Sequence, residues 1–373
     1  MRVRLAATAI AIVLTTACAS DGSDTASRAT SGSSPTAVEP APPTVPDLPT
    51  TSAPRTFSAD AFDATDAALD TRLQAAGVGG MVRVVAADGS VIHEHANGGF
   101  TADTALSIAS ATKWFTAATF MTFVDGNAIG LDDDISRWLP EFAGSTPAIT
   151  PRQLLSGTSG VRDHSCQNGG VGLADCVRTL AASPREFPAG TRYSYGNSPF
   201  LVVGRLVEEL GRADFATVVH DRLTGPLGMG STTWPGAPGT ANPAFGAQTT
   251  VDDYGRFLVM MLREGGAEPK RVLSPRAVAE MVTNQVSGYD TTHDYSVGIT
   301  GIPRYGLGCW IDVDDPSGRA AVASGSGGLG LYPWVDFTTR TYGIVGVQDA
   351  RGAELAVPAS QRVAIEARTA VAG

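Results

Sequence analysis

Two residues with the chemistry of acyl transfer, Ser110 and Lys113, lie three positions apart in a segment that is predicted to begin a buried helix. On a helix, a spacing of three places both side chains on one face. A serine hydroxyl becomes an effective nucleophile when an adjacent base takes its proton, and a lysine amine can be that base where burial lowers its pKa. The pair therefore predicts a lysine-activated serine, with the positive end of the helix available to stabilise an oxyanion.

Lysine is rare in this chain, since only Lys113 and Lys270 are lysines among 27 basic residues. Arginine stays protonated and cannot serve as a general base, so a lysine among arginines is a candidate for chemistry. Lys270 follows Glu268 and Pro269 and is interpreted as a surface residue. The alternative for Ser110 and Lys113 is a serine at a helix N-terminus with a solvated lysine, and the short motif alone does not decide between them.

A second polar pair, Tyr195 and Asn197, follows in the run 193–197. A tyrosine beside the lysine amine can relay a proton to a leaving group, and an asparagine can hold a substrate amide. The alternative is a packed aromatic residue in a turn. The sequence contains no Gly-x-Ser-x-Gly motif, which argues against the nucleophile arrangement of an α/β-hydrolase.

The elements that must position these residues are recognisable at both ends of the chain. Period-two patterns predict strands, and apolar residues at helical spacing predict helices. The predicted strands are 81–86, 91–95, 306–313, 319–323 and 342–347, and the predicted helices that flank them are 59–75 and 355–372. We expect an α/β (α+β) fold in which one antiparallel sheet joins strands from both ends, with the first and last helices on one face. The middle, about 104–290, is predicted as an inserted, mostly helical domain.

The first 56 residues are not expected to belong to this fold. Two arginines precede an apolar run that is too short to cross a bilayer, which needs ~20 residues, so 1–18 is predicted to be an export signal. Cys18 follows a small residue, as in a bacterial lipoprotein signal, and would carry the lipid; the alternative is cleavage and release. Residues 19–56, rich in Ser, Thr and Pro, are predicted to be a disordered tether. The remaining residues, 57–373, form the predicted catalytic domain.

Export would place the protein at the outer face of a bacterial cytoplasmic membrane or outside the cell, where disulfides can form. Cys166 and Cys176 lie close enough in sequence to close a small loop, whereas Cys309 has no evident partner and is predicted to be a buried strand residue. No Cys/His group has zinc spacing, so neither a metal nor another cofactor is expected. A net charge of −10 argues against a nucleic-acid partner.

Taken together, these motifs resemble the serine β-lactamase and DD-peptidase superfamily, on the branch of class C β-lactamases, D-amino-acid peptidases and family VIII esterases. Beyond the Ser110–Lys113 and Tyr195–Asn197 elements, the runs that match in order are 130–135, 138–142, 149–160 and 226–229. The resemblance covers nearly all of 58–370 and implies the family's combination of a sheet with a helical domain. It also implies that Ser110 is acylated, that Lys113 takes its proton, that Tyr195 passes a proton to the leaving group and that Asn197 orients the substrate.

The family's third element, usually Lys-Thr-Gly or the same motif with His in place of Lys, is best matched by the run 325–328. By the resemblance, Ser326 and Gly327 would line the substrate site. The Gly328 N–H would join the N–H of Ser110 as the second donor of the oxyanion hole.

This third element departs from the family pattern because Gly325 stands where the cation belongs. An alignment shifted by one residue places Ser324 there, which is also uncharged. The cation helps to bind the carboxylate of β-lactams and cell-wall peptides, so its loss leaves room for neutral esters or amides. Arg319 or Arg340 could supply charge from nearby.

These observations predict an exported serine hydrolase that acts through a Ser110 acyl-enzyme on an ester, a small peptide or amide, or a β-lactam. The alternative is a slow or non-catalytic protein that binds cell-wall peptides, which the missing cation would favour. A structural surface protein with an unused site accounts least well for the four motif residues.

Overall fold

The computed structural model describes residues 56–164, 166, 171–267 and 271–373, within which Phe57–Gly373 forms a compact unit. The predicted export signal with Cys18, residues 19–55 of the predicted tether, and Lys270 lie outside the described residues.

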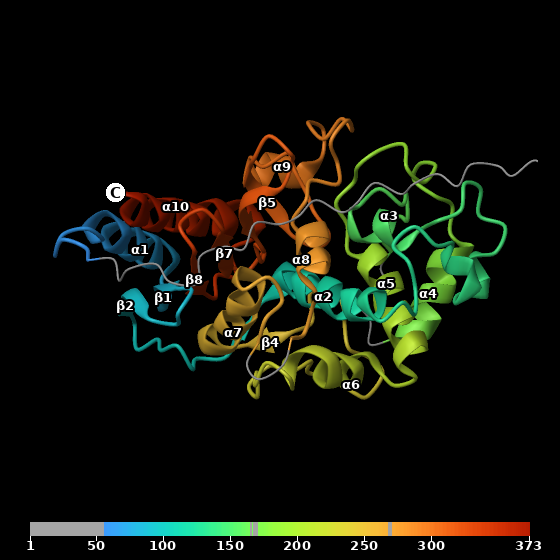
Figure 1. Cartoon of the computed structure of the whole chain (residues 1–373), viewed down its shortest axis with the longest axis horizontal. Coiled ribbons are helices and arrows are strands. Elements are labelled where there is room, and N and C mark those ends of the chain that lie inside the picture. The colour runs from blue at the N-terminus through green and yellow to red at the C-terminus, as the bar shows by residue number, and fades with distance from the viewer. Residues whose placement is uncertain (1–55, 165, 167–170, 268–270) are drawn as a thin grey trace, which may run out of the picture. The chain divides into compact units, whose positions relative to one another are not determined.

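The described chain combines a sheet, built from strands near its two ends, with helices that come mainly from its middle (Figure 1). The helices are α1 Asp63–Ala76, α2 Thr112–Asp125, α3 Pro151–Leu155, α4 Leu173–Ala182, α5 Ser198–Gly211, α6 Phe215–Val219, α7 Val251–Leu262, α8 Pro275–Met281, α9 Tyr295–Thr300 and α10 Ala353–Ala372. The strands are β1 Gly80–Ala86, β2 Val91–Asn97, β3 Leu106–Ser107, β4 Gln248–Thr249, β5 Trp310–Asp314, β6 Ala320–Ser324, β7 Tyr332–Asp336 and β8 Thr341–Val347.

Six of these strands form one sheet in the order β2-β1-β8-β7-β6-β5, and every neighbouring pair is antiparallel. β1 pairs with β8, with Val82 opposite Val345, so the two ends of the chain meet in the middle of the sheet. This confirms the predicted α/β fold and its shared antiparallel sheet.

Both faces of the sheet are packed against other parts of the protein. Successive side chains of a strand point to opposite sides, so a single strand contributes to the packing on both faces. In β1, Val82 and Val84 join the apolar cluster beneath α1 and α10, whereas Met81 and Val85 join the larger cluster on the other face. The first and last helices therefore share one face, as predicted, and α1 and α10 lie side by side in Figure 1.

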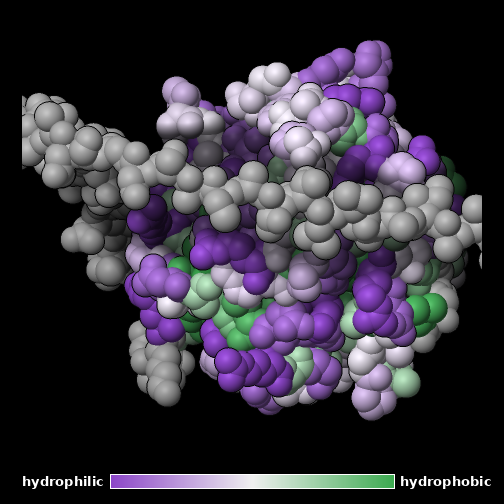
Figure 2. Space-filling model, turned by 90° about the vertical axis from the view of Figure 1, so that its right-hand side faces the viewer, coloured by the Kyte–Doolittle hydropathy of each residue, from purple (hydrophilic) through white to green (hydrophobic). Residues whose placement is uncertain are grey.

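The opposite face of the sheet leads into the helical region, which contains α3 to α6 (Figure 1). Helix α2 lies between the two regions and is buried on all sides over most of its length, with Trp114, Phe115 and Phe120 fully buried. A helix buried on every side cannot shift without disturbing both regions, so residues at its N-terminus are held rigidly. The outer face of the helical region is mostly hydrophilic, with scattered apolar side chains (Figure 2).

The structure also corrects element boundaries. The strand predicted over 306–313 begins only at Trp310, since the preceding residues form a turn in which Gly308 has a left-handed φ of +81°. A Cβ on Gly308 would lie 2.8 Å from the Lys113 carbonyl oxygen, so glycine lets this turn pack directly on α2. Cys309 is buried, as predicted, but it lies in this turn beside β5.

Candidate active site

The predicted nucleophile, Ser110, lies on a single 3₁₀ turn, Ala109–Ala111, immediately before α2. Ala109 has a φ of +46°, which is unusual for a residue with a side chain, and its carbonyl accepts a 2.7 Å hydrogen bond from the Thr112 hydroxyl. Strained backbone of this kind persists only where the surroundings hold it and is concentrated at functional sites. The helix that was predicted to contain Ser110 therefore begins two residues later, at Thr112.

The Lys113 amine reaches back across this turn to Ser110. Its Nζ lies 2.9 Å from Ser110 Oγ, 2.7 Å from Asn197 Oδ1 and 3.2 Å from the Ala244 carbonyl oxygen. Three acceptors thus fix the direction of the amine and leave its nitrogen within proton-transfer distance of the serine hydroxyl. The alternative of a solvated lysine does not hold, because Lys113 is 1% exposed.

Burial of the Lys113 amine also changes its pKa. Desolvation lowers the pKa of Lys113 from 10.5 to about 7, although the negative charge of Asp163 acts in the opposite direction. Removing an ammonium from water disfavours its charged form, and one carboxylate does not offset that cost here. Near neutral pH a large share of Lys113 is therefore unprotonated and able to accept the proton of Ser110.

Tyr195 lines the same cavity as the predicted nucleophile, Ser110. Its ring stacks on Trp310, with the centroids 5.2 Å apart, and lies 4.9 Å from the Lys113 amine. Burial raises the pKa of Tyr195 well above its usual value, and the neighbouring Ser110 side chain only partly opposes this shift. Tyr195 is therefore a protonated phenol at neutral pH, which is the form that can donate to a leaving group.

The third predicted element, Ser326 to Gly328, lies in the loop between β6 and β7 and faces the same site. A Cβ on Gly327 would collide with the carbonyl oxygen of Ile108, so the absence of a side chain lets this loop lie against the segment that leads into Ser110. The Gly328 N–H donates to no backbone acceptor among the described residues. This leaves it available as a donor to an oxyanion beside Ser110.

The cation of the family pattern has no substitute in this region. A Cβ on Gly325 would lie 2.9 Å from Trp114 and 3.1 Å from the Tyr254 hydroxyl, so the position has no room for a long side chain. Ser324 is buried and donates to Asp312 Oδ1 at 2.6 Å.

The two arginines considered as substitutes are not found at the site. Arg319 is paired with Glu264 at 3.0 Å. Neither Arg319 nor Arg340 lines the cavity at Ser110.

That cavity, about 90 Å³ in volume, is bounded by residues from six parts of the chain. They are Ser110, Tyr195, Tyr295, Ser296, Ile299, Thr300, Trp310, Ser326, Gly328, Ala353 and Val357. None of these residues is charged at neutral pH, and most of the surface they offer is aromatic or aliphatic. Within the described chain, the site therefore combines a serine hydroxyl beside a buried amine with walls suited to a neutral, apolar group.

Several residues of this site were not predicted from the sequence. The walls from α9 and α10, the Ala244 carbonyl and Asp163 come from distant segments that carry no recognisable motif. The sequence does contain an indication that α9 begins here, because Asp294 is a helix-capping residue type and accepts a hydrogen bond from the Ser296 N–H at 3.0 Å. A capping residue does not show, however, which part of the protein its helix will face.

The described residues also bear on metals, membranes and cysteines. They contain no group of three or more His, Cys, Asp or Glu residues that could hold a metal ion, and no described helix is long and apolar enough to cross a membrane. Cys166 and Cys176 are joined by a disulfide with their Cα atoms 5.4 Å apart. A larger hollow of about 560 Å³ lies around Asp132 and Arg152, which pair with each other at 2.8 Å. Neither the Ser110–Lys113 pair nor the Tyr195–Asn197 pair lines this hollow.

Comparison with known proteins identifies the family of this chain. The family model described as Beta-lactamase matches residues 65–368. The crystal structure of a β-lactamase-type protein from Bacteroides dorei DSM 17855 is 30% identical and superposes with a TM-score of 0.72, covering 83% of this chain and 98% of that one.

Two curated relatives are also informative. An uncharacterized protein of Mycobacterium tuberculosis is 28% identical over 290 residues, which cover 62% of this chain and 72% of that protein. Esterase EstB of Burkholderia gladioli is 30% identical over 208 residues, which cover 47% of this chain and 53% of the esterase. The similarity to EstB therefore spans about half of each protein.

Proposed function

The chain belongs to the β-lactamase family and is a serine hydrolase, and on that premise we propose that it hydrolyses neutral esters through an acyl-enzyme on Ser110. Family membership confirms the resemblance inferred from the motifs. The observation that carries the ester proposal is the uncharged cavity beside Ser110, together with a position 325 that has no room for the family's cation.

The proposed reaction begins with proton transfer from Ser110 to the neutral Lys113 amine. Ser110 Oγ then attacks the ester carbonyl carbon, and the developing oxyanion accepts hydrogen bonds from the N–H groups of Ser110 and Gly328. Collapse of the tetrahedral intermediate breaks the bond to the alcohol oxygen, which takes a proton from Tyr195, and Lys113 returns a proton to the tyrosine. Attack by water on the acyl-enzyme, with the same groups removing its proton, releases the acid.

Asn197 has a supporting role in this scheme. Its Oδ1 holds the Lys113 amine at 2.7 Å, which leaves the side-chain amide N–H groups as the part able to donate to a substrate carbonyl. The sequence predicted that Asn197 would contact the substrate. In the structure its side-chain oxygen accepts a hydrogen bond from the Lys113 amine instead.

The ester proposal is tested by comparing substrates on the purified chain. We expect hydrolysis of p-nitrophenyl esters of short acids, and a kcat/KM for a chromogenic cephalosporin that is lower by at least about tenfold, because a buried carboxylate without a charged partner loses about 1.5–3 kcal/mol. Intact mass after treatment with a fluorophosphonate would report the activated serine independently of substrate choice.

The outcomes separate three functions. Comparable turnover of the cephalosporin would restore the β-lactamase interpretation. Absence of both turnover and fluorophosphonate labelling would make a peptide-binding role the better hypothesis.

We further propose that the protein is exported and anchored by a lipid on Cys18. The support is the charged and apolar N-terminal pattern, together with a disulfide that would be reduced in a typical cytoplasm. The expected result is that the chain fractionates with membranes and that Cys18→Ala moves it to the soluble fraction. Recovery of the wild-type chain in the cytoplasm would contradict this proposal.

A further inference from the structure

The segment that carries Tyr195 and Asn197 has no regular secondary structure of its own. Such a segment must be held by other contacts if its side chains are to stay in place. Its backbone N–H groups donate to two carboxylates: that of Tyr195 to Asp294 Oδ2 at 2.8 Å, and that of Asn197 to Asp163 Oδ1 at 2.8 Å.

The contact with Asp163 is unusual for a helix N-terminus. Asn197 is the N-cap residue of α5, and asparagine at this position normally accepts a hydrogen bond from its own helix. Here its side chain makes no capping bond, because Oδ1 accepts the Lys113 amine instead. Asp163 supplies the missing cap from another segment, accepting the N–H groups of Asn197 and of Ser198, the latter at 2.7 Å.

The fit between this carboxylate and the segment is close. A Cβ on Gly196 would lie 3.0 Å from Asp163 Oδ1, so the glycine between the two motif residues leaves space for the carboxylate. A continuous chain of hydrogen bonds then runs from Asp163 through Asn197 and Lys113 to Ser110.

We propose that Asp163 is a positioning residue of the acyl-transfer site: it caps α5 in place of Asn197 and so leaves the Asn197 side chain free to hold the Lys113 amine beside Ser110. The inference rests on the proposed function, since it assigns Asp163 a part in that reaction. It predicts two separable effects, one from the hydrogen bonds and one from the charge.

The charge effect follows from what surrounds the amine. The polar groups that face Lys113 are Ser110 on its own turn, Tyr195 and Asn197 before α5, and the Ala244 carbonyl, all uncharged at neutral pH. Asp163 is the charged group among the described residues that opposes the burial-induced fall in the pKa of Lys113. Because Asp163 is exposed, its field is partly screened by solvent and salt.

The test compares Asp163→Asn with Asp163→Ala by the rate at which a fluorophosphonate labels Ser110, measured as a function of pH on the full chain. Labelling of the wild type should rise through the pKa of Lys113, about 7, as the amine loses its proton. Asparagine keeps the accepting oxygen and removes the charge, so the midpoint should move to lower pH, by about 0.5 unit. Alanine also removes the cap, and its maximal labelling rate should fall about tenfold.

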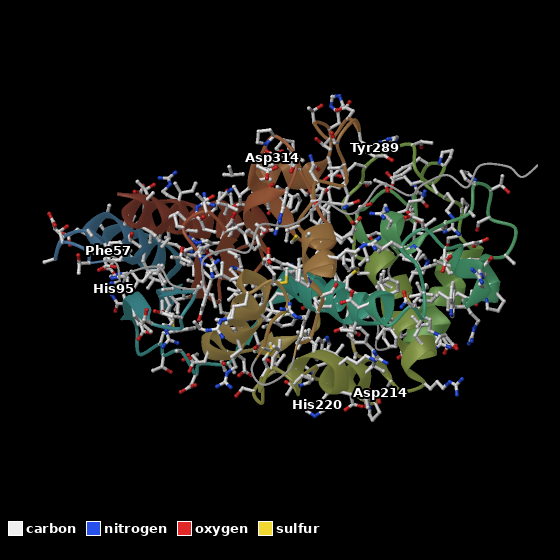
Figure 3. All side chains as sticks on the ribbon, viewed as in Figure 1. Phe57, His95, Asp214, His220, Tyr289 and Asp314 are labelled. Atoms are coloured by element: carbon white, nitrogen blue, oxygen red, sulfur yellow. A yellow bond between two sulfur atoms is a disulfide. The ribbon has the colours of Figure 1, made fainter. Side chains whose placement is uncertain are left out.

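Asp214→Asn is the matched control. Asp214 caps α6 through the Thr217 N–H at 3.2 Å. It lies at the lower edge of the view in Figure 3, whereas α9, which lines the cavity at Ser110, lies near the upper edge of the same view in Figure 1. Removing this charge should leave the labelling midpoint where it is in the wild type. Circular dichroism and the melting temperature of each variant identify any loss of fold.

The results distinguish the inference from the function on which it rests. A labelled wild type whose midpoint is unchanged in Asp163→Asn and whose maximal rate is unchanged in Asp163→Ala would overturn the positioning role. A wild type that is not labelled at any pH would instead count against the proposed function.

Discussion

Replacement of Ser110 by alanine is expected to abolish ester hydrolysis and fluorophosphonate labelling while the protein stays folded. In the proposed reaction the hydroxyl oxygen forms the acyl-enzyme, so kcat/KM should fall by about 10⁴-fold or more. Stability should change little, because Lys113 retains Asn197 and the Ala244 carbonyl as acceptors after the hydroxyl is lost. We expect the free energy of unfolding to change by less than about 1 kcal/mol.

Ser107→Ala is a matched control for this experiment. Ser107 lies on β3, and its hydroxyl accepts a 3.2 Å hydrogen bond from the Gln248 side chain, outside the cavity. The control should keep at least half of the wild-type activity and should still be labelled. Hydrolysis at the wild-type rate by Ser110→Ala would show that another residue is the nucleophile.

Much of this site could be predicted because its central residues are local in sequence or belong to recognisable motifs. Ser110 and Lys113 are one helical turn apart, so their contact follows from helix geometry even though the turn is partly 3₁₀. The contact between Lys113 and Asn197 bridges 84 residues and could be expected only through the family resemblance. The shared sheet was predictable because its strands carry period-two or continuous apolar patterns at both ends of the chain.

What could not be predicted depends on tertiary approach. No sequence rule indicates that Asp163 would cap a helix that begins at Ser198, because a cap normally comes from the adjacent residue. β7 was not predicted as a strand because all five of its residues are buried and one is Pro333, so it has no alternation to detect. The apolar walls from α9 and α10 follow from the packing of whole elements around the site.

The base is tested most directly by changing Lys113 in two ways. Lys113→Arg keeps a positive charge that cannot be given up, and Lys113→Met keeps the length of the side chain without any basic group. Both should lower kcat/KM by about 10²–10⁴-fold, the range expected when a general base is removed. A rate close to that of the wild type in either variant would show that Lys113 is not the base.

Stability should separate these two variants, which activity does not. Burial depresses the pKa of Lys113 from 10.5 to about 7, so between these values the unfolded chain binds a proton that the folded chain does not. The contribution of this residue to the free energy of unfolding therefore rises with pH across that window. Methionine has no such dependence, and arginine retains a buried charge at every pH in the window.

We therefore expect Lys113→Met to be more stable than Lys113→Arg at pH 7, by about 2 kcal/mol or more, because the guanidinium would be buried where the amine can discharge. Relative to the wild type, the stability of Lys113→Met should be highest near pH 7 and should decline toward pH 10, as measured by urea unfolding at each pH. A difference between Lys113→Met and wild type that does not vary with pH would mean that the amine is not held at a depressed pKa. In that case the proton of Ser110 would need another acceptor, and Tyr195, which lines the same cavity as Ser110, would be the next residue to change.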